Sequence, residues 1–172
     1  MDNFPEGVSV AGRRHGAAVT RLQSLSLLAA AGSVALLGGA LAFQYLGGLA
    51  PCHLCILQRW PHAIAILAGI VILFRPARPV ALVAAAVVLV GAGIGVYHAG
   101  IELNWWPGPT TCTAPGAAGV EPGALLDQIL ATPVVLCDQV AWSLLGISMA
   151  GWNAILSLGI AWLWFRAAAA DD

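Results

Sequence analysis

Charge is what this sequence has least of. Only 9% of its 172 residues are charged, none of them is a lysine, and the formal net charge is −1. Soluble domains are about one quarter charged, and proteins that bind nucleic acid carry basic patches that neutralise phosphates. The composition therefore excludes an ordinary soluble domain and argues against nucleic acid as a partner.

Long apolar runs take the place of charge, because 60% of the residues are hydrophobic. A helix that crosses a lipid bilayer needs about 20 mostly apolar residues. Four stretches meet this requirement, at about 22–46, 55–74, 80–100 and 142–165. They leave no room for a separate soluble domain, so we predict one integral membrane domain, residues 1–172, with an all-α fold: a bundle of four transmembrane helices.

The arginines predict the orientation of this bundle. All except Arg59 flank the first stretch, fill the turn between the second and third, or follow the fourth: Arg13, Arg14, Arg21, Arg75, Arg78 and Arg166. Under the positive-inside rule these places are cytoplasmic. Both termini are then cytoplasmic, and the loop at about 101–141 faces outward. Within this loop, residues 122–131 predict a short helix that lies on the membrane surface, because it is too short to span.

All four cysteines fall on or beside the predicted outer side: Cys52, Cys55, Cys112 and Cys137. An even number of cysteines in an oxidising compartment indicates disulfides. Four cysteines allow three pairings, and their spacing does not choose among them.

Cys52 and Cys55 are expected at the start of the second stretch, in the first turn after Pro51. Residues at i and i+3 lie on the same side of a helix, and Arg59 follows four residues after Cys55. A helix N-terminus and a nearby cation favour the thiolate, which is the reactive form of cysteine. The pattern therefore predicts a redox-active pair.

Arg59 and two histidines extend this predicted site. An arginine inside the hydrocarbon is costly, and no acidic residue lies within any of the four stretches, so we expect a thiolate, a ligand carbonyl or water as its acceptor. His62 follows on the same face, and His98 lies near the outer end of the third stretch. A buried histidine is usually a packing residue, but one that faces a reactive pair can donate protons.

Two other kinds of protein remain open from the residues alone. One is a purely structural bundle held by two disulfides. The other is a metal- or haem-binding membrane protein, although zinc sites commonly repeat the short cysteine spacing, and the second cysteine pair lacks it. Its ligands would come from Cys52, Cys55, His53, His62 and His98.

The motif Pro-Cys-x-x-Cys-x-x-x-Arg opens the second of four predicted spans, and it is followed by Tyr97-His98 and by an outer loop with two more cysteines. This arrangement resembles the DsbB family of bacterial disulfide bond formation proteins, from the first span to the fourth. The resemblance implies a multi-pass protein in the lipid bilayer of the bacterial inner membrane, with its cysteines on the periplasmic side. One departure is His53 between the paired cysteines, where an apolar residue is usual.

The resemblance also implies a function. Cys112 and Cys137 would exchange with a periplasmic DsbA-like thioredoxin-fold protein, and Cys52 and Cys55 would be reoxidised by membrane quinone, either ubiquinone or menaquinone. Arg59 and His98 would lie beside the quinone, with His62 as a further candidate. A related possibility is a quinone-coupled enzyme of the vitamin K epoxide reductase type, but its paired cysteines usually come late in the bundle.

Overall fold

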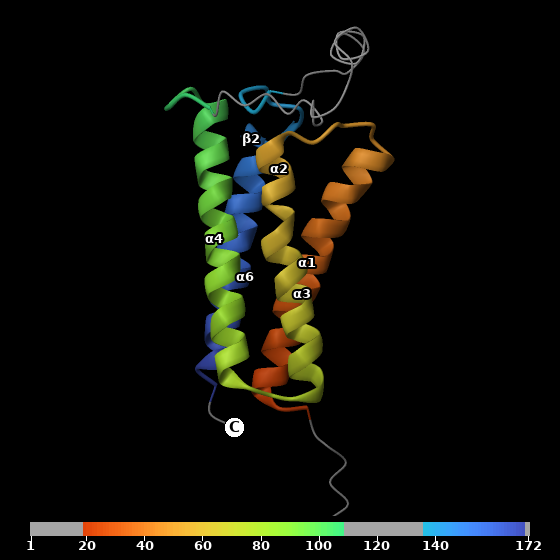
Figure 1. Cartoon of the computed structure of the whole chain (residues 1–172), viewed down its shortest axis with the longest axis vertical. Coiled ribbons are helices and arrows are strands. Elements are labelled where there is room, and N and C mark those ends of the chain that lie inside the picture. Colours follow the sequence, from red (N-terminus) through yellow and green to blue (C-terminus); the bar gives the residue numbers. More distant parts are fainter. Residues whose placement is uncertain (1–18, 109–135, 171–172) are drawn as a thin grey trace, which may run out of the picture.

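The computed structural model describes residues 19–108 and 136–170, which are mostly helical. A small β-hairpin precedes the last helix, and four long helices stand side by side (Figure 1). The elements in chain order are α1 Arg21–Tyr45, α2 His53–Leu57, α3 Arg59–Phe74, α4 Arg78–Glu102, β1 Ser143–Leu144, β2 Ile147–Ser148 and α6 Met149–Ala168.

The long helices form a closed bundle: α1 packs on α3 and α6, and α4 packs on the same two helices. Close approach depends on small residues. A β-carbon built at Gly69 of α3 would lie only 2.5 Å from the Ala30 methyl carbon of α1, and one at Gly95 of α4 would lie 3.1 Å from the methyl carbon of Ala154. Small residues at such crossings are typical of membrane helices, whose association depends on close packing.

The bundle has two ends, which we name by their residues. The arginine end holds Arg21, Arg75, Arg78 and Arg166, together with both ends of the described chain, and the cysteine end holds α2 and the hairpin (Figure 1). This agrees with the grouping expected from the sequence. Which end faces the cytoplasm stays a prediction. Cys112 and the short surface helix predicted at 122–131 lie outside the described residues.

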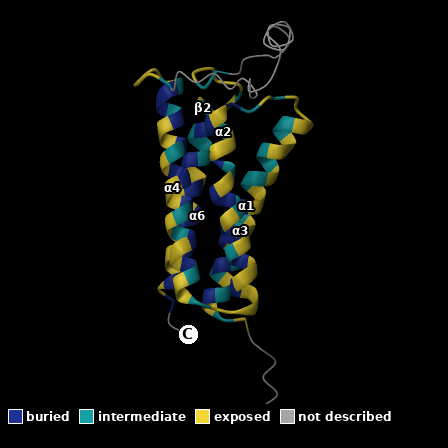
Figure 2. Ribbon diagram, in the orientation of Figure 1, coloured by how far each residue is buried: buried dark blue, intermediate teal, exposed yellow. Residues whose placement is uncertain are grey.

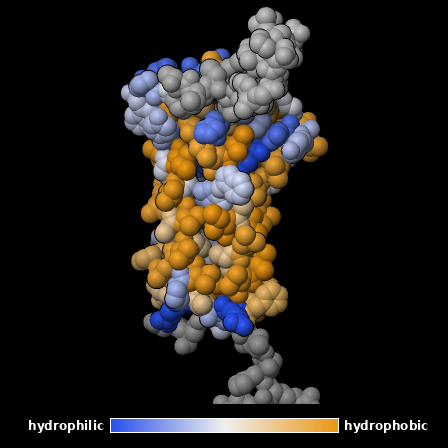
Figure 3. Space-filling view, in the orientation of Figure 1, coloured by the Kyte–Doolittle hydropathy of each residue, from blue (hydrophilic) through white to orange (hydrophobic). Residues whose placement is uncertain are grey.

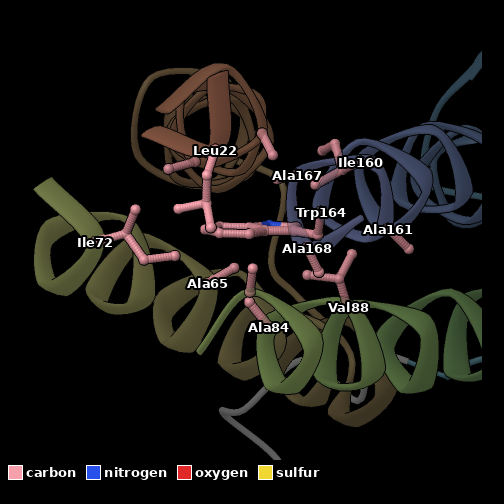
Figure 4. Packing of buried hydrophobic residues seen from close by; sticks show 13 residues of the cluster. Leu22, Ala65, Ile72, Ala84, Val88, Ile160, Ala161, Trp164, Ala167 and Ala168 are labelled. Carbon is pink, nitrogen blue, oxygen red and sulfur yellow. The ribbon is translucent and has the colours of Figure 1, made fainter. Parts of the chain in front are cut away.

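The main apolar core lies toward the arginine end. Trp164 of α6 is fully buried at its centre, surrounded by side chains of the other three long helices (Figure 4). Most of its neighbours are small, which lets the four backbones come close around one large ring. The buried members are Leu22, Ala29, Ala30, Ala65, Ile72, Ala81, Ala84, Val88, Ile160, Ala161, Trp164, Ala167 and Ala168.

Outward faces of the helices are exposed and apolar (Figures 2 and 3). Three helical segments are long and apolar enough to cross a membrane: Arg21–Tyr45, His53–Phe74 and Arg78–Glu102. Together with the mostly helical fold, they support the predicted membrane protein. The fourth transmembrane span is not among them and stays a prediction, although α6 completes the bundle with 20 residues.

The predicted start of the fourth stretch was wrong. Residues 142–148, expected in a helix, contain the hairpin of β1 and β2, in which Ser143 lies opposite Ser148. Its two-residue turn consists of Leu145 and Gly146, both with positive φ, at 54° and 77°. Such a turn fits the twist of a hairpin, and it delays the helix until Ser148 caps its first turn.

Two other boundaries differ from the prediction. The second stretch is interrupted at Gln58, between α2 and α3, because Pro61 has no N–H to donate to the Leu57 carbonyl. The third stretch, expected to end at residue 100, continues to Glu102. Glu102 was expected in the outer loop, but it belongs to the last turn of α4, one turn beyond His98.

Candidate functional site

Cys52 and Cys55 lie together at the start of α2. Cys52 is the N-cap residue, and its sulfur accepts a hydrogen bond from the Cys55 N–H over 3.3 Å. The two sulfurs are 2.9 Å apart and both cysteines are free thiols. Cys52 is buried, whereas Cys55 is half-buried. The local fold of the cap therefore brings the two sulfurs together.

The chain brings a third cysteine to this pair from the segment before the hairpin. The sulfurs of Cys52 and Cys137 and a ring nitrogen of His98 all lie within 4.8 Å of one another. Spacing in the sequence left the cysteine pairing open, but this geometry allows Cys137 to exchange with Cys52. The same three atoms could also hold a metal ion, so the structure does not remove that alternative.

The environment holds protons on two of these sulfurs. A hydrogen bond with the Cys55 sulfur, followed by burial, raises the pKa of Cys52 to about 12. Burial also raises the pKa of Cys137, although the backbone groups of Leu54 and His53 at the start of α2 oppose the shift. Near neutral pH, Cys52 is therefore a thiol when the pair is reduced.

His98 of α4 reaches the cysteine pair from the side. Its Nε2 atom is 3.5 Å from the Cys52 sulfur and 3.9 Å from Oε1 of Glu102. Its other ring nitrogen, Nδ1, is 3.0 Å from Nε2 of Gln58. Both nitrogens of a nearly buried ring are thus engaged, which fixes the ring orientation beside Cys52.

Arg59 has a side-chain partner other than the expected thiolate, ligand carbonyl or water. Its Nη1 donates to Oε1 of Gln44 on α1 over 2.6 Å, and its buried Nε lacks a hydrogen-bond partner among the described residues. An amide is neutral, so Gln44 orients the guanidinium without cancelling its charge. A glutamine near the end of an otherwise apolar stretch was the available signal.

His62 of α3 is buried, and within the described part of the chain its hydrogen bonds go to other polar side chains and not to the cysteines. Its Nε2 lies 3.2 Å from Asn153 Oδ1 and 3.3 Å from Ser157 Oγ, and its Nδ1 lies 3.4 Å from Ser33 Oγ. Asn153 in turn donates to Gln58 over 2.6 Å. A buried polar network links the two histidines, and its linking residues Gln58 and Asn153 were not among the site residues predicted from the sequence.

One pocket connects these groups. It has a volume of about 370 Å³ and lies between α1, the α2–α3 segment, the hairpin and α6. Most of its lining is apolar and includes Phe43 and Trp142. The polar lining residues are Cys55, Gln58, Arg59, His62, His98 and Asn153. An apolar pocket with a few converging polar groups is the usual form of a small-molecule site.

The chain is similar in sequence to known proteins. The sequence profile of the family described as disulfide bond formation protein DsbB matches residues 22–167. Disulfide bond formation protein B of Methylococcus capsulatus is 36% identical over 73% of this chain and 81% of its own length. Its counterpart in Neisseria meningitidis serogroup A is 34% identical over 78% and 90%.

A further similar protein is disulfide bond formation protein B 2 of Pseudomonas aeruginosa, which is 35% identical over 74% of this chain and 79% of its own length. No solved structure matches the chain. The family profile covers the cysteine pair, α3, α4 and α6 except its last residue. The resemblance read from the motif is therefore confirmed, and the chain belongs to the DsbB family of disulfide bond formation proteins, membrane proteins with a thiol oxidoreductase role.

Proposed function

We propose that this protein is a protein-dithiol:quinone oxidoreductase, which reoxidises a periplasmic DsbA-like thioredoxin-fold protein and passes the electrons to membrane quinone. One observation carries the proposal: Cys55 and Arg59 line the same apolar pocket, and Cys55 is next to a sulfur that Cys137 can reach. The site thus joins a route for thiol exchange to a cavity for an apolar electron acceptor.

The first exchange takes place at the outer pair, Cys112 and Cys137. A thiolate of the reduced partner attacks this disulfide and forms a mixed disulfide. The second thiolate of the partner then attacks the mixed disulfide, so that the partner leaves oxidised. Two electrons have moved to the outer pair, which is now a dithiol.

The second exchange transfers these electrons to the inner pair. The Cys137 thiolate attacks the Cys52 sulfur, the Cys52–Cys55 bond breaks, and Cys55 leaves as a thiolate. Cys112 then attacks Cys137, the outer disulfide forms again, and Cys52 leaves. Proximity of the Cys52 and Cys137 sulfurs supports this order, since exchange requires direct access of one sulfur to the other.

The pocket fits a quinone, which supplies an acceptor of two electrons and two protons. Its apolar lining suits the ring, and the buried Nε of Arg59 needs an acceptor such as a carbonyl oxygen. Arg59 would bind that oxygen and stabilise negative charge on it in a site with little water. Cys55 would face the ring, and the Cys52–Cys55 disulfide forms again as the pair gives up two electrons and two protons.

The test combines purified protein, ubiquinone and a reduced periplasmic thioredoxin-fold oxidase, and follows quinone absorbance. We expect quinone loss that depends on the partner and disappears in Cys55→Ser. If the protein consumes no quinone with any such partner, the proposal fails. A thiol-trapping gel in which neither cysteine pair reacts with the partner would support the purely structural bundle instead.

Metal binding is a second candidate, favoured by the closeness of Cys52, His98 and Cys137. Two thiolates and an imidazole suit a soft metal such as zinc. Elemental analysis and a visible spectrum of the reduced protein separate the two functions. Stoichiometric metal together with loss of folding after chelation would favour the metal site, whereas quinone turnover that a chelator leaves unchanged would favour the oxidoreductase.

A further inference from the structure

A directed chain of hydrogen bonds runs through the buried side of the site. Nδ2 of Asn153 donates to Oε1 of Gln58, Nε2 of Gln58 lies 3.0 Å from Nδ1 of His98, and Nε2 of His98 lies 3.5 Å from the Cys52 sulfur. Gln58 is 6% exposed and His98 is 3% exposed. The chain begins on α6 and ends at the reactive pair, crossing the junction between α2 and α3.

Two contacts fix the orientation of the Gln58 amide. Its Nε2 donates to the Leu54 carbonyl over 3.2 Å, and a carbonyl oxygen can only accept. Its Oε1 accepts from the Asn153 amide over 2.6 Å. If the nitrogen and oxygen of this amide were exchanged, its oxygen would face the Leu54 carbonyl oxygen and its NH₂ group would face the NH₂ group of Asn153. The Gln58 nitrogen must therefore be the atom beside His98.

The tautomer of His98 follows from this orientation. Because Gln58 presents an N–H to Nδ1, that ring nitrogen must accept, and the neutral ring carries its hydrogen on Nε2. Nε2 is the nitrogen that faces the Cys52 sulfur. We propose that Gln58 and Asn153 are positioning residues that hold His98 in its Nε2–H tautomer, with this hydrogen directed at Cys52.

The consequence for exchange rests on the proposed function. In the last step, Cys112 attacks the Cys137 sulfur, the Cys112–Cys137 bond forms, and the bond between Cys137 and Cys52 breaks. Cys52 leaves with the electron pair as a thiolate, which accepts the hydrogen bond from His98. A stabilised thiolate leaves faster. In the opposite tautomer, the Nε2 lone pair would face the sulfur and oppose its departure.

The direct test is the ¹⁵N NMR spectrum of the reduced full-length protein with labelled histidine rings in lipid nanodiscs. His98 is assigned by its absence in His98→Gln. We expect the Nε2–H pattern in the native protein and a change to the Nδ1–H or doubly protonated pattern in Gln58→Glu, which replaces the donor with an acceptor. A native Nδ1–H pattern, or an unchanged pattern in Gln58→Glu, would overturn the assignment.

The matched control is Gln23→Glu at the arginine end. Gln23 also donates from its amide to backbone carbonyls, at 3.4 Å to Ile72 and 3.1 Å to Leu73. Its acceptor role in capping α1 suits a glutamate equally well. We expect this variant to leave the His98 spectrum unchanged. A milder second variant, Asn153→Asp, removes the donor to Gln58 while keeping the shape, and should weaken the Nε2–H signal.

A kinetic test measures the release of Cys52 without quinone or partner. In Cys55→Ser/Cys112→Ser, oxidation should join Cys52 to Cys137, and glutathione then cleaves this bond. Adding Gln58→Glu should slow the appearance of alkylatable Cys52 by roughly three- to tenfold, whereas Gln23→Glu should not. An equal rate would overturn the role in exchange. Because neither readout involves quinone, failure of this inference is distinguishable from failure of the proposed function.

Discussion

The same long helices form both ends of the bundle, but one end is an apolar core and the other holds the reactive groups. At the arginine end, small apolar residues pack around Trp164. At the cysteine end, the apolar cluster of the described residues has Cys52, Leu54 and Ile101 as its buried members. The same half of the bundle holds the buried polar side chains Gln58, His62 and His98. Buried polar groups are costly in a membrane and mark function. The larger apolar core thus lies away from the reactive groups.

Helix α1 takes part in both ends. Its first half packs Ala29 and Ala30 against the other helices, while its second half, from Ala35 to Phe43, lines the pocket. In Figure 1 the cysteine-end half of α1 leans away from the rest of the bundle. Close packing at one end therefore leaves room for a ligand at the other.

Replacing Cys55 should have the largest effect on activity. If activity is unchanged, the contrast between a reactive cysteine end and a packed arginine end fails. Cys55→Ser removes a sulfur that no neighbour can replace, so quinone-dependent oxidation of the partner should fall by at least about 10³-fold. The control is Gly93→Ala on α4, where an added β-carbon meets open space. Oxidation at the native rate in Cys55→Ser would place the chemistry outside the cysteine end.

Overpacking the arginine end should lower the stability of the protein rather than its catalytic activity. Gly69→Leu would drive a side chain into Ala30 and should cost about 1–3 kcal/mol, visible as a lower Tm of the purified protein. Gly159→Leu, at a position with open space, should change Tm little. Equal Tm values for both variants would contradict the tight packing of this end.

Replacing Arg59 tests whether its positive charge contributes to quinone binding at the cysteine end. Arg59→Ala should raise the apparent KM for quinone about tenfold, equivalent to about 1.4 kcal/mol of binding. Gln44→Leu should raise it less, because the charge remains and only its orientation is loosened. Quinone kinetics measured for both variants decide the point, and an unchanged KM in Arg59→Ala would remove its role in binding.

The smallest effect concerns the pH dependence of one thiol. Since burial raises the pKa of Cys137, its thiolate fraction at neutral pH is below that of an ordinary cysteine. In a variant that keeps only Cys137, alkylation at pH 7 should be slow and should rise about tenfold per pH unit beyond the usual thiol pKa of about 8.5.

The reference thiol for this measurement belongs at the other end of the bundle. Pro76→Cys, in the exposed turn between α3 and α4, supplies it in a background without the native cysteines. Its alkylation rate should level off at lower pH than that of Cys137. If the two pH profiles coincide, burial does not govern the reactivity of Cys137.

The sequence predicted what depends on local pattern. Apolar runs indicated the long helices, and the Pro-Cys-x-x-Cys-x-x-x-Arg motif indicated the family, because both are contained in short segments. Gln44 meets Arg59, and Asn153 meets Gln58 and His62, only because the helices pack together. Local sequence pattern does not predict such contacts. The hairpin was missed because Leu144, Leu145 and Ile147 look like part of an apolar helix, and nothing in the sequence signals a positive φ at Leu145.

The Cys52 cap ties backbone geometry to oxidation state. Helix α2 has five residues, too few to be stable by itself, and its first turn is closed by the Cys55 N–H bonded to the Cys52 sulfur. When Cys52 passes from a disulfide with Cys55 or Cys137 to a free thiol, the sulfur that accepts from this amide changes its chemical state, so we expect the strength of the hydrogen bond to change with it. We therefore expect the hydrogen-exchange rate of the Cys55 amide to report the oxidation state of Cys52.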